Sequence, residues 1–392
     1  MPTSEGEGAR RDEARAREAT RAGRGVVTIA FAKFYFMVAG FVLELRLNAL
    51  LGNTLYGAYG IVNSLVSPFN NVLVTGTIQA VSRFASQRPE EARAIQRAGL
   101  RMHLRVGLVL AVAFAALSPV VARLQKDAAL TGPIMLASII VAAYSFYAVF
   151  VGTANGRREF HKQAALDITF STMRVAGIIG LVAAGLGLYG AIGAWSGAAC
   201  VILVVSMFVV GLPRGAGAAR ADLRPMVGFL VGVSIYLGLL NLIMVADQLL
   251  LKPLSAGWFA AHEGEVLAAA RPLVPDWLLG RVARLSPADA ASAQVGYYRA
   301  VQTLARLSYQ AIIAGMFVVF PLISRSTFEE DREATVRYIR NTMRYSLVFA
   351  SAIAVVLAAN PAAILDLPFQ ADYAYFGAPA LVALALGNVA FS

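Results

Sequence analysis

The sequence has one cysteine, three histidines and few charged residues for a chain of 392 residues. Because Cys200 is the only cysteine, no disulfide can form within the chain, and a cluster of cysteine ligands for a metal is not available. Charged residues make up 15% of the chain, against about 25% in an average soluble domain. These shortages exclude a disulfide-stabilised fold and argue against a soluble globular protein.

Signature motifs of enzymes are also missing. The sequence contains no HExxH, no GxSxG and no phosphate-binding P-loop. The stretch GLGLYG at 185–190 matches GxGxxG, but no strand precedes it, and a dinucleotide site requires a strand, a turn and a helix. We therefore predict a tight turn at 185–190, no enzymatic activity, no cofactor and no metal site.

Apolar residues, by contrast, make up 58% of the chain. A helix needs about 20 apolar residues to cross a bilayer, and backbone polar groups in lipid must be satisfied within the protein. The sequence therefore predicts an all-α polytopic membrane protein with about ten spans. The expected spans are 25–45, 55–83, 102–121, 132–155, 168–186, 191–212, 226–251, 295–324, 345–359 and a tenth that begins near 377.

The net charge of +11 has two explanations, a nucleic-acid partner or membrane topology. Arginines and lysines are concentrated in the N-terminal tail and in every second connection between spans. Loops with this positive bias remain in the cytoplasm. We therefore expect no nucleic-acid partner, a cytoplasmic N-terminus and, at 1–24, a disordered or loosely helical cytoplasmic tail.

The chain contains a weak internal repeat. A shift of 239 positions aligns Gly57 with Gly296, Tyr59 with Tyr298, Arg93 with Arg332 and Arg101 with Arg340. Spans two and three thus correspond to spans eight and nine, and the even number of spans between them gives both copies the same orientation. Parallel repeats of this kind are an architecture of membrane transporters.

The repeat divides the chain into two lobes. The first lobe is expected at 25–212, a cytoplasmic linker at 213–225 and the second lobe at 226–392. Because the second copy ends within its fourth span, we expect a truncated second lobe. The segment 253–293 is expected to be an outer loop with short amphipathic helices at the membrane interface.

Several ionisable side chains fall inside the expected spans. Arg299 and Arg306 are seven positions apart, which is about 20° around a helix and about 10 Å along it, and Gln302 lies on the same stripe. A cation at mid-bilayer costs about 2.5–3.5 kcal/mol on insertion scales, so both arginines are expected to face protein or water. The other ionisable residues expected inside spans are Lys33, Arg174 and Asp247.

Two interpretations of these residues remain open. In the structural one, Arg299 or Arg306 pairs with Asp247. Glu44 pairs with Arg46 near the outer end of span one, and asparagines join spans by hydrogen bonds. The asparagines in question are Asn63, Asn70 and Asn71. In the functional one, the basic and polar groups line a central cavity and hold an anionic substrate. The four interior cations outnumber the one deep acid, which favours the functional interpretation, with Asp247 as a candidate acid for ion coupling.

Three stretches of the chain resemble bacterial polysaccharide exporters, the oligosaccharide-lipid flippases of the multidrug/oligosaccharidyl-lipid/polysaccharide (MOP) superfamily. They are VGYYRAVQTLARLSYQAIIAGMFVVFPLISR, VGTANGRREFHKQAALDITFSTMRVAGIIGLVAAGLGLYGAIGA and ANPAAILDLPFQADYAYFGAPALVALALG. The resemblance implies twelve or fourteen helices in two six-helix lobes that open alternately to each side of a bacterial cytoplasmic membrane.

The same resemblance implies a lipid-linked oligosaccharide as substrate, in which a polyprenyl diphosphate carries a sugar repeat unit. The candidate residues for the diphosphate are Lys33, Arg174, Arg299 and Arg306, with Gln302, Asn63 and Asn70 as polar neighbours. Membrane lipids are the other expected partners, and the sequence identifies no polysaccharide polymerase partner.

Three alternatives remain. A flippase for lipid II, the peptidoglycan precursor, would need the same cationic interior. A multidrug antiporter of the same superfamily would place acids rather than bases in its cavity. A truncated membrane protein without transport activity is consistent with the incomplete second lobe.

Overall fold

The computed structural model describes residues 4–213, 224–262, 265, 268, 271–272, 274–307 and 332–391, with side chains from Thr28 onward. The first helix, α1 (Ser4–Asn70), contains two passes that meet at Gly52. Gly52 has a φ of 69°, a backbone conformation that glycine adopts without the steric cost of a Cβ atom. The chain reverses there, and the second pass continues through η1 (Asn71–Thr75) into α2 (Gly76–Gln87).

The rest of the first half consists of helices joined by short turns. They are η2 (Pro89–Glu91), α3 (Ala92–Leu124), η3 (Ala128–Leu130), α4 (Thr131–Gly156), α5 (Phe160–Leu181), η4 (Val182–Leu186) and α6 (Gly187–Val210). The chain reverses between α5 and α6, where Gly185 and Gly187 both have positive φ values. The predicted tight turn at 185–190 is therefore confirmed.

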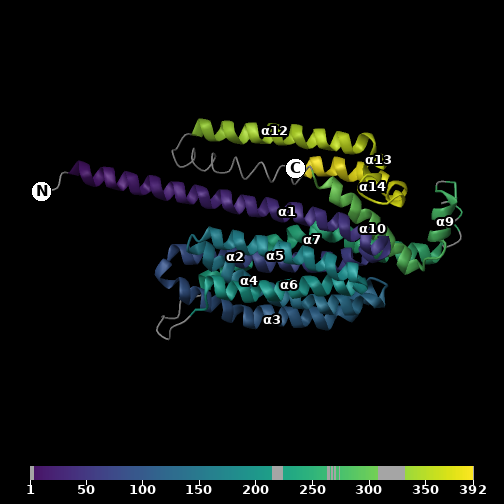
Figure 1. The fold of residues 1–392 in the computed structure, drawn as a ribbon, viewed down its shortest axis with the longest axis horizontal. Coiled ribbons are helices and arrows are strands. Elements are labelled where there is room, and N and C mark those ends of the chain that lie inside the picture. Colours follow the sequence, from purple (N-terminus) through teal and green to yellow (C-terminus); the bar gives the residue numbers. More distant parts are fainter. Residues whose placement is uncertain are drawn as a thin grey trace.

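The second half is likewise helical. Its described helices are α7 (Arg224–Ala261), α9 (Asp276–Val282), α10 (Pro287–Ala305), α12 (Arg332–Ala359), α13 (Pro361–Asp366) and α14 (Ala371–Phe391). In Figure 1, α12 and α14 lie on the opposite side of α1 from α3, α4 and α6, while α7 and α10 pass close to α1.

The predicted all-α membrane fold is confirmed for the described part of the chain, in which no strand occurs. Among the described residues, seven helical stretches are long and apolar enough to cross a membrane, and two of them, 28–87 and 160–210, contain a reversal and so cross twice. With α10, this makes about ten passes, as the hydrophobic runs predicted.

Several predicted boundaries are wrong. The tail at 1–24 was expected to be disordered or loosely helical, and a span was expected to begin at 25. The helix α1 already begins at Ser4, so the boundary at 25 is not the start of a helix. The segment 253–293 is not one loop, because α7 continues through Pro253 to Ala261 and α10 already begins at Pro287. In each case a helix extends beyond its apolar run, since polar residues at the ends of a span continue the backbone hydrogen bonding. The part of span eight at 308–324 lies outside the described residues.

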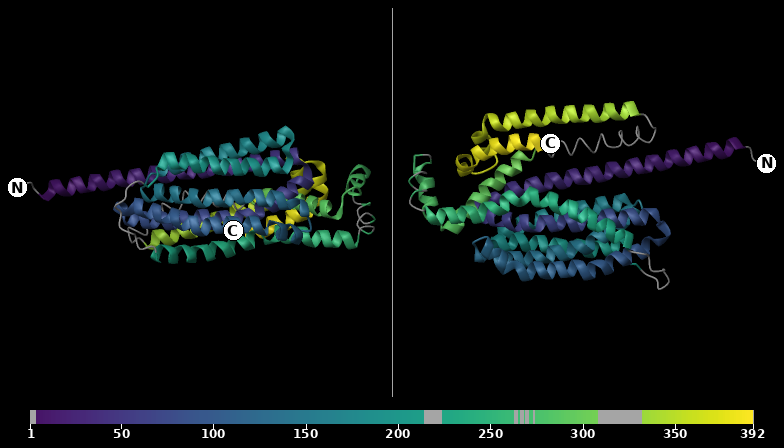
Figure 2. Two further views of the ribbon diagram at one scale, coloured as in Figure 1. Left: turned by 90° about the horizontal axis from the view of Figure 1, so that it is seen from below. Right: turned by 180° about the vertical axis from the view of Figure 1, so that it is seen from behind.

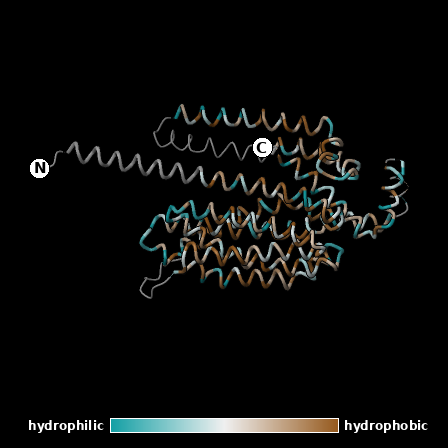
Figure 3. Tube along the Cα trace, in the orientation of Figure 1, coloured by the Kyte–Doolittle hydropathy of each residue, from teal (hydrophilic) through white to brown (hydrophobic). Residues whose placement is uncertain are grey.

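We call the two ends of the bundle the Gly52 end and the Gln87 end, after the reversals that they contain. The turns at Gly185 and around α13 lie at the Gly52 end, and α9 extends beyond it (Figure 2). The N-terminal part of α1 extends beyond the Gln87 end. Figure 3 shows mainly hydrophobic residues along the bundle and hydrophilic ones gathered towards its ends and around α9.

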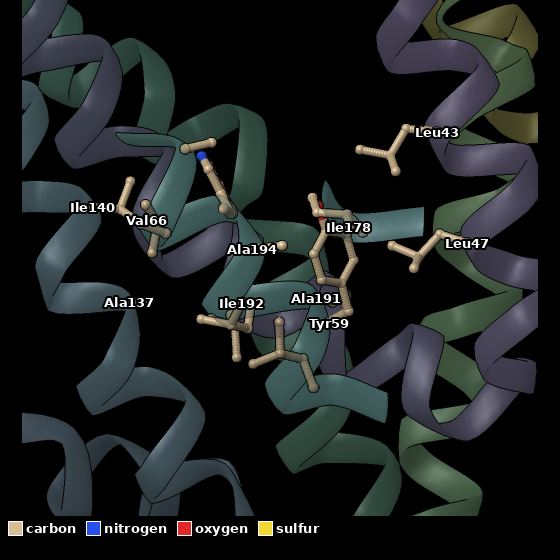
Figure 4. Close-up of a cluster of buried hydrophobic side chains, with 14 of the residues drawn as sticks. Leu43, Leu47, Tyr59, Val66, Ala137, Ile140, Ile178, Ala191, Ile192 and Ala194 are labelled. Carbon is tan, nitrogen blue, oxygen red and sulfur yellow. The ribbon is translucent and has the colours of Figure 1, made fainter. Parts of the chain in front are cut away.

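The hydrophobic core lies among the helices of the first half and reaches α10 and α14. Figure 4 shows Leu43 and Leu47 of α1 pointing toward Tyr59 and Ile178. Large apolar side chains also cover the outside; for example, Phe208 is 84% exposed. An apolar outer surface of this extent is typical of contact with lipid.

The two halves meet at residues that the internal repeat aligns with each other. A Cβ atom on Gly57 would overlap the carbonyl oxygen of Ser292, and a Cβ atom on Gly296 would overlap that of Asn53. Gly57 and Gly296 are related by the shift of 239 positions, and so are Asn53 and Ser292. The second pass of α1 and α10 therefore cross as repeat-related helices, and small residues let their backbones approach closely.

Candidate functional site

Arg299 and Glu44 form an ion pair between the two halves. The Nε and Nη2 atoms of Arg299 donate to the two carboxylate oxygens of Glu44 at 2.9 and 2.6 Å. Two-point bonds of this kind are among the strongest arginine–carboxylate contacts. Arg299 lies on α10 and Glu44 on the first pass of α1. The expected pairing of Glu44 with Arg46 is wrong, because helix packing brings Arg299 to Glu44 and leaves Arg46 exposed.

Aromatic side chains from the first half surround this pair. The guanidinium carbon of Arg299 lies 5.6 Å from the ring centre of Tyr56 and 5.1 Å from that of Tyr59, within the range of a cation–π interaction. The Tyr56 hydroxyl also donates to Glu44 at 2.8 Å. Gly60 lies directly against the Arg299 side chain. The arginine is thus held by the first half although it belongs to the second.

Asp247 has a different set of partners from the one predicted. Its Oδ2 atom accepts hydrogen bonds from the Tyr298 hydroxyl at 2.6 Å and from Nε2 of Gln302 at 2.7 Å. The predicted pairing of Asp247 with Arg299 is wrong, and Arg306 donates instead to the Met244 carbonyl at 3.4 Å. Asp247 therefore binds neutral donors of its own half, since α7 and α10 pack side by side.

Arg174 of α5 is the second arginine of this region. Its guanidinium carbon lies 4.6 Å from the ring centre of Trp195, whose Nε1 donates to the Tyr144 hydroxyl. The Nε atom of Arg174 is buried without a hydrogen-bond partner among the described residues. Arg174 also lies within electrostatic range of Glu44. It therefore supplies positive charge within electrostatic range of the Arg299–Glu44 pair.

Lys33 has a counter-ion that the sequence analysis missed. Its Nζ atom lies 2.8 Å from Oδ2 of Asp167 on α5, and the Lys33 side chain is 43% exposed. The prediction that one deep acid faces four interior cations is therefore wrong. Glu44 and Asp167 neutralise two of those cations, and Arg174 and Arg306 have no carboxylate within ion-pairing distance in the described ranges.

The polar residues of the second pass of α1 join it to α7. Ser64 donates to Gln248, and Asn71 donates to Asn241, so Asn71 does connect two helices as the structural interpretation expected. The Oδ1 atom of Asn70 is buried and has no partner among the described residues. Asn63 is half-buried on the same pass, and a role for Asn63 and Asn70 in substrate binding stays a prediction.

A second polar cluster joins the halves at the Gly52 end. The fully buried Lys252 of α7 donates to Asp127 at 2.5 Å and to Ser292 at 2.7 Å. Next to Gly296, Asn53 donates to the Tyr297 hydroxyl at 2.6 Å and to Asp372 at 3.2 Å. At this end, a hydrogen bond therefore connects α1 to α14, and an ion pair connects α7 to the turn before η3.

Sequence reasoning missed Glu44, Asp167 and Lys252 as parts of these clusters. Each is an ionisable residue within an apolar helix, which is by itself a reason to suspect a functional role. Their partners lie 255, 134 and 125 positions away. Such pairs depend on how the helices are rotated and packed, and no local pattern indicates them.

The arrangement suits the binding of an anion better than catalysis. Arg299 binds the Glu44 carboxylate, and Arg174 lies within electrostatic range of it. The Tyr59 ring and Nε2 of Gln248 lie beside Arg299. The Tyr59 hydroxyl and Nε2 of Gln248 are buried without a hydrogen-bond partner in the described part of the chain. Arginine matches the oxygens of phosphate and carboxylate groups with two parallel hydrogen bonds.

Comparisons with known proteins agree with the fold. The family described as "Polysaccharide biosynthesis protein" matches residues 47–251, about half of the chain. No curated protein matches the chain in sequence.

Several solved structures are similar in fold. A MOP superfamily transporter from Pyrococcus furiosus, described by the reverse polarity of its binding pocket, has a TM-score of 0.59 and 13% identity, covering 93% of this chain and 78% of that one. An outward-facing multidrug resistance MATE family transporter has a TM-score of 0.59 and 12% identity, covering 94% and 79%. An inward-facing one has a TM-score of 0.52 and 14% identity, covering 92% and 77%.

Proposed function

Because the chain belongs to the polysaccharide biosynthesis protein family, we propose that it moves a polyprenyl-diphosphate-linked oligosaccharide across a bacterial cytoplasmic membrane. The oligosaccharide would then serve the assembly of surface polysaccharide. The two halves carry the two copies of the parallel repeat, and they would expose the region between them alternately to each side of the membrane.

The observation that carries this proposal is the arginine cluster at the contact between the halves. Arg299 links α10 to α1, and Arg174 adds a second guanidinium within electrostatic range of the same carboxylate. A diphosphate group offers many oxygen acceptors to such donors. A multidrug antiporter would instead favour acids at this position, so the cluster supports an anionic substrate.

The orientation follows from the basic residues. The arginine-rich connections at 83–105 and 157–162 lie at the Gln87 end, which we therefore assign to the cytoplasm. The Gly52 end would face outward. Asp247 remains the candidate acid for coupling transport to an ion, because its described partners are neutral donors. Gln302 would hold that acid in place.

Replacement of Arg174 by glutamine tests the proposal most cleanly. Arg299 is a poorer choice, because its loss would leave Glu44 as a buried charge without a counter-ion. In a strain that depends on this protein, Arg174→Gln should reduce surface polysaccharide by roughly tenfold, the worth of one charged hydrogen bond, at an unchanged protein level. The matched control is Arg46→Gln, since Arg46 is exposed on α1; normal polysaccharide in Arg174→Gln would contradict the proposal.

A lipid II flippase is the second candidate, because lipid II presents the same diphosphate to the arginine cluster. The two functions differ in the precursor that accumulates when Arg174→Gln slows transport. Accumulation of the surface-polysaccharide precursor supports the first function, and accumulation of the peptidoglycan precursor supports the second.

A further inference from the structure

Arg299 is inserted into the opposite half of the protein. It belongs to α10, yet its ion-pair partner Glu44 and the rings of Tyr56 and Tyr59 are all on α1. Only 8% of its side chain is exposed. The guanidinium therefore depends on the first half both for its counter-charge and for its aromatic neighbours.

This dependence opposes separation of the halves. If α10 moved away from α1 with nothing bound, Arg299 would lose the only ion-pair partner that the described residues give it, and Glu44 would keep only the more distant charge of Arg174. A buried charge without a counter-ion is strongly disfavoured. Separation therefore requires another anion to replace Glu44 on Arg299.

The surroundings of the pair suit such a replacement. The Glu44 side chain is 17% exposed, about twice as much as that of Arg299, so the carboxylate is the more accessible member. Nε2 of Gln248 lies close to Gly60, beside Arg299, and has no partner among the described residues. A diphosphate has more acceptor oxygens than a carboxylate, so it can take both bonds of Arg299 and still bind a free donor.

We propose that Glu44 is a displaceable counter-ion, whose place on Arg299 is taken by the anionic head group of the substrate. This inference rests on the proposed function for the identity of the anion. Loss of the Glu44–Arg299 bonds then frees α10 from α1, so that the loaded protein leaves this conformation more readily than the empty one does. Glu44 is a positioning residue, because it acts on the substrate only through Arg299. Its displacement from Arg299 couples substrate binding to the movement of α10 away from α1.

A binding measurement tests the displacement. We suggest purified full-length protein in phosphatidylcholine nanodiscs, with farnesyl diphosphate as the probe. Glu44→Gln removes the competing charge and should tighten binding by roughly tenfold, the worth of a charged hydrogen bond. Glu44→Asp keeps the charge and should bind like the wild type. Equal affinity of Glu44→Gln and the wild type, or equal tightening in Glu44→Asp, would overturn the inference.

A distance measurement tests the coupling in the wild-type site. Leu124 and Leu367 are exposed residues of opposite halves at the Gly52 end, and Cys200 is the only cysteine to be replaced, by serine. Spin labels at the two leucines should show a longer distance when farnesyl diphosphate is added. An unchanged distance between the two labels at a saturating concentration of farnesyl diphosphate would overturn the inference. This test uses the wild-type site, so it does not depend on whether Glu44→Gln folds.

The two measurements separate the inference from the proposed function. If the wild type and both variants bind no diphosphate, the proposed function fails and the inference falls with it. If the wild type binds the probe but Glu44→Gln gains nothing, only the displaceable counter-ion is refuted.

Discussion

Addition of one methyl group at the contact between the halves should loosen that contact. In Gly57→Ala the new Cβ atom would overlap the carbonyl oxygen of Ser292 and press on the backbone nitrogen of Gly296. Both obstacles are backbone atoms, so no side-chain rotation can relieve the overlap. The second pass of α1 and α10 must therefore move apart.

The size of the effect follows from two opposing terms. Overpacking of a well-packed contact costs about 1–3 kcal/mol, and an overlap with backbone belongs at the upper end of this range. Alanine in place of glycine stabilises a helix by about 1 kcal/mol. The net cost is about 2 kcal/mol, which lowers the population of the closed contact by roughly thirtyfold relative to separated or unfolded states.

Thermal unfolding of the purified protein measures this cost. Gly57→Ala should lower the melting temperature by a few degrees. The matched control is Gly232→Ala on α7, because nothing lies within 4 Å of a Cβ atom built there, and the control should be as stable as the wild type or more so. The reasoning is refuted if Gly57→Ala melts no lower than Gly232→Ala.

Two further predictions concern the polar cluster at the Gly52 end. Asp127→Asn leaves the fully buried amine of Lys252 without its carboxylate and should lower the free energy of unfolding by about 3–5 kcal/mol. Lys252→Met should lower it less, because the Asp127 carboxylate can be hydrated. Chemical denaturation that finds Lys252→Met less stable than Asp127→Asn would contradict this. Asn53→Asp places a second carboxylate next to the buried Asp372, so it should lower the melting temperature more than Asn53→Ala does. Equal melting temperatures of the two variants would show that the side chains at positions 53 and 372 are not in contact.

Much of the fold follows from local features of the sequence. The length of each apolar run predicts a membrane pass, because a bilayer imposes a minimum apolar length on every spanning helix. The glycines at 185–190 predict the reversal between α5 and α6. The shift of 239 positions predicts that Gly57 and Gly296 occupy equivalent places, and the structure brings these two residues into contact.

Helix ends were less predictable. Hydropathy marks the part of a helix that lies in lipid, and α1 and α7 continue beyond that part into more polar sequence. Backbone hydrogen bonds continue wherever the residues tolerate helical geometry, whatever their polarity. The boundaries expected at 25 and 251 therefore describe the apolar runs rather than the helices.

The sequence by itself determined that ionisable side chains lie within the spans, and that charge balance would decide their role. Only the tertiary structure decided the balance, by pairing Arg299 with Glu44 and Lys33 with Asp167. The physical reason is that a helix surface presents its charges in every direction. Rotation, depth and packing against other helices select which opposite charge each one meets, and these depend on contacts more than a hundred positions apart.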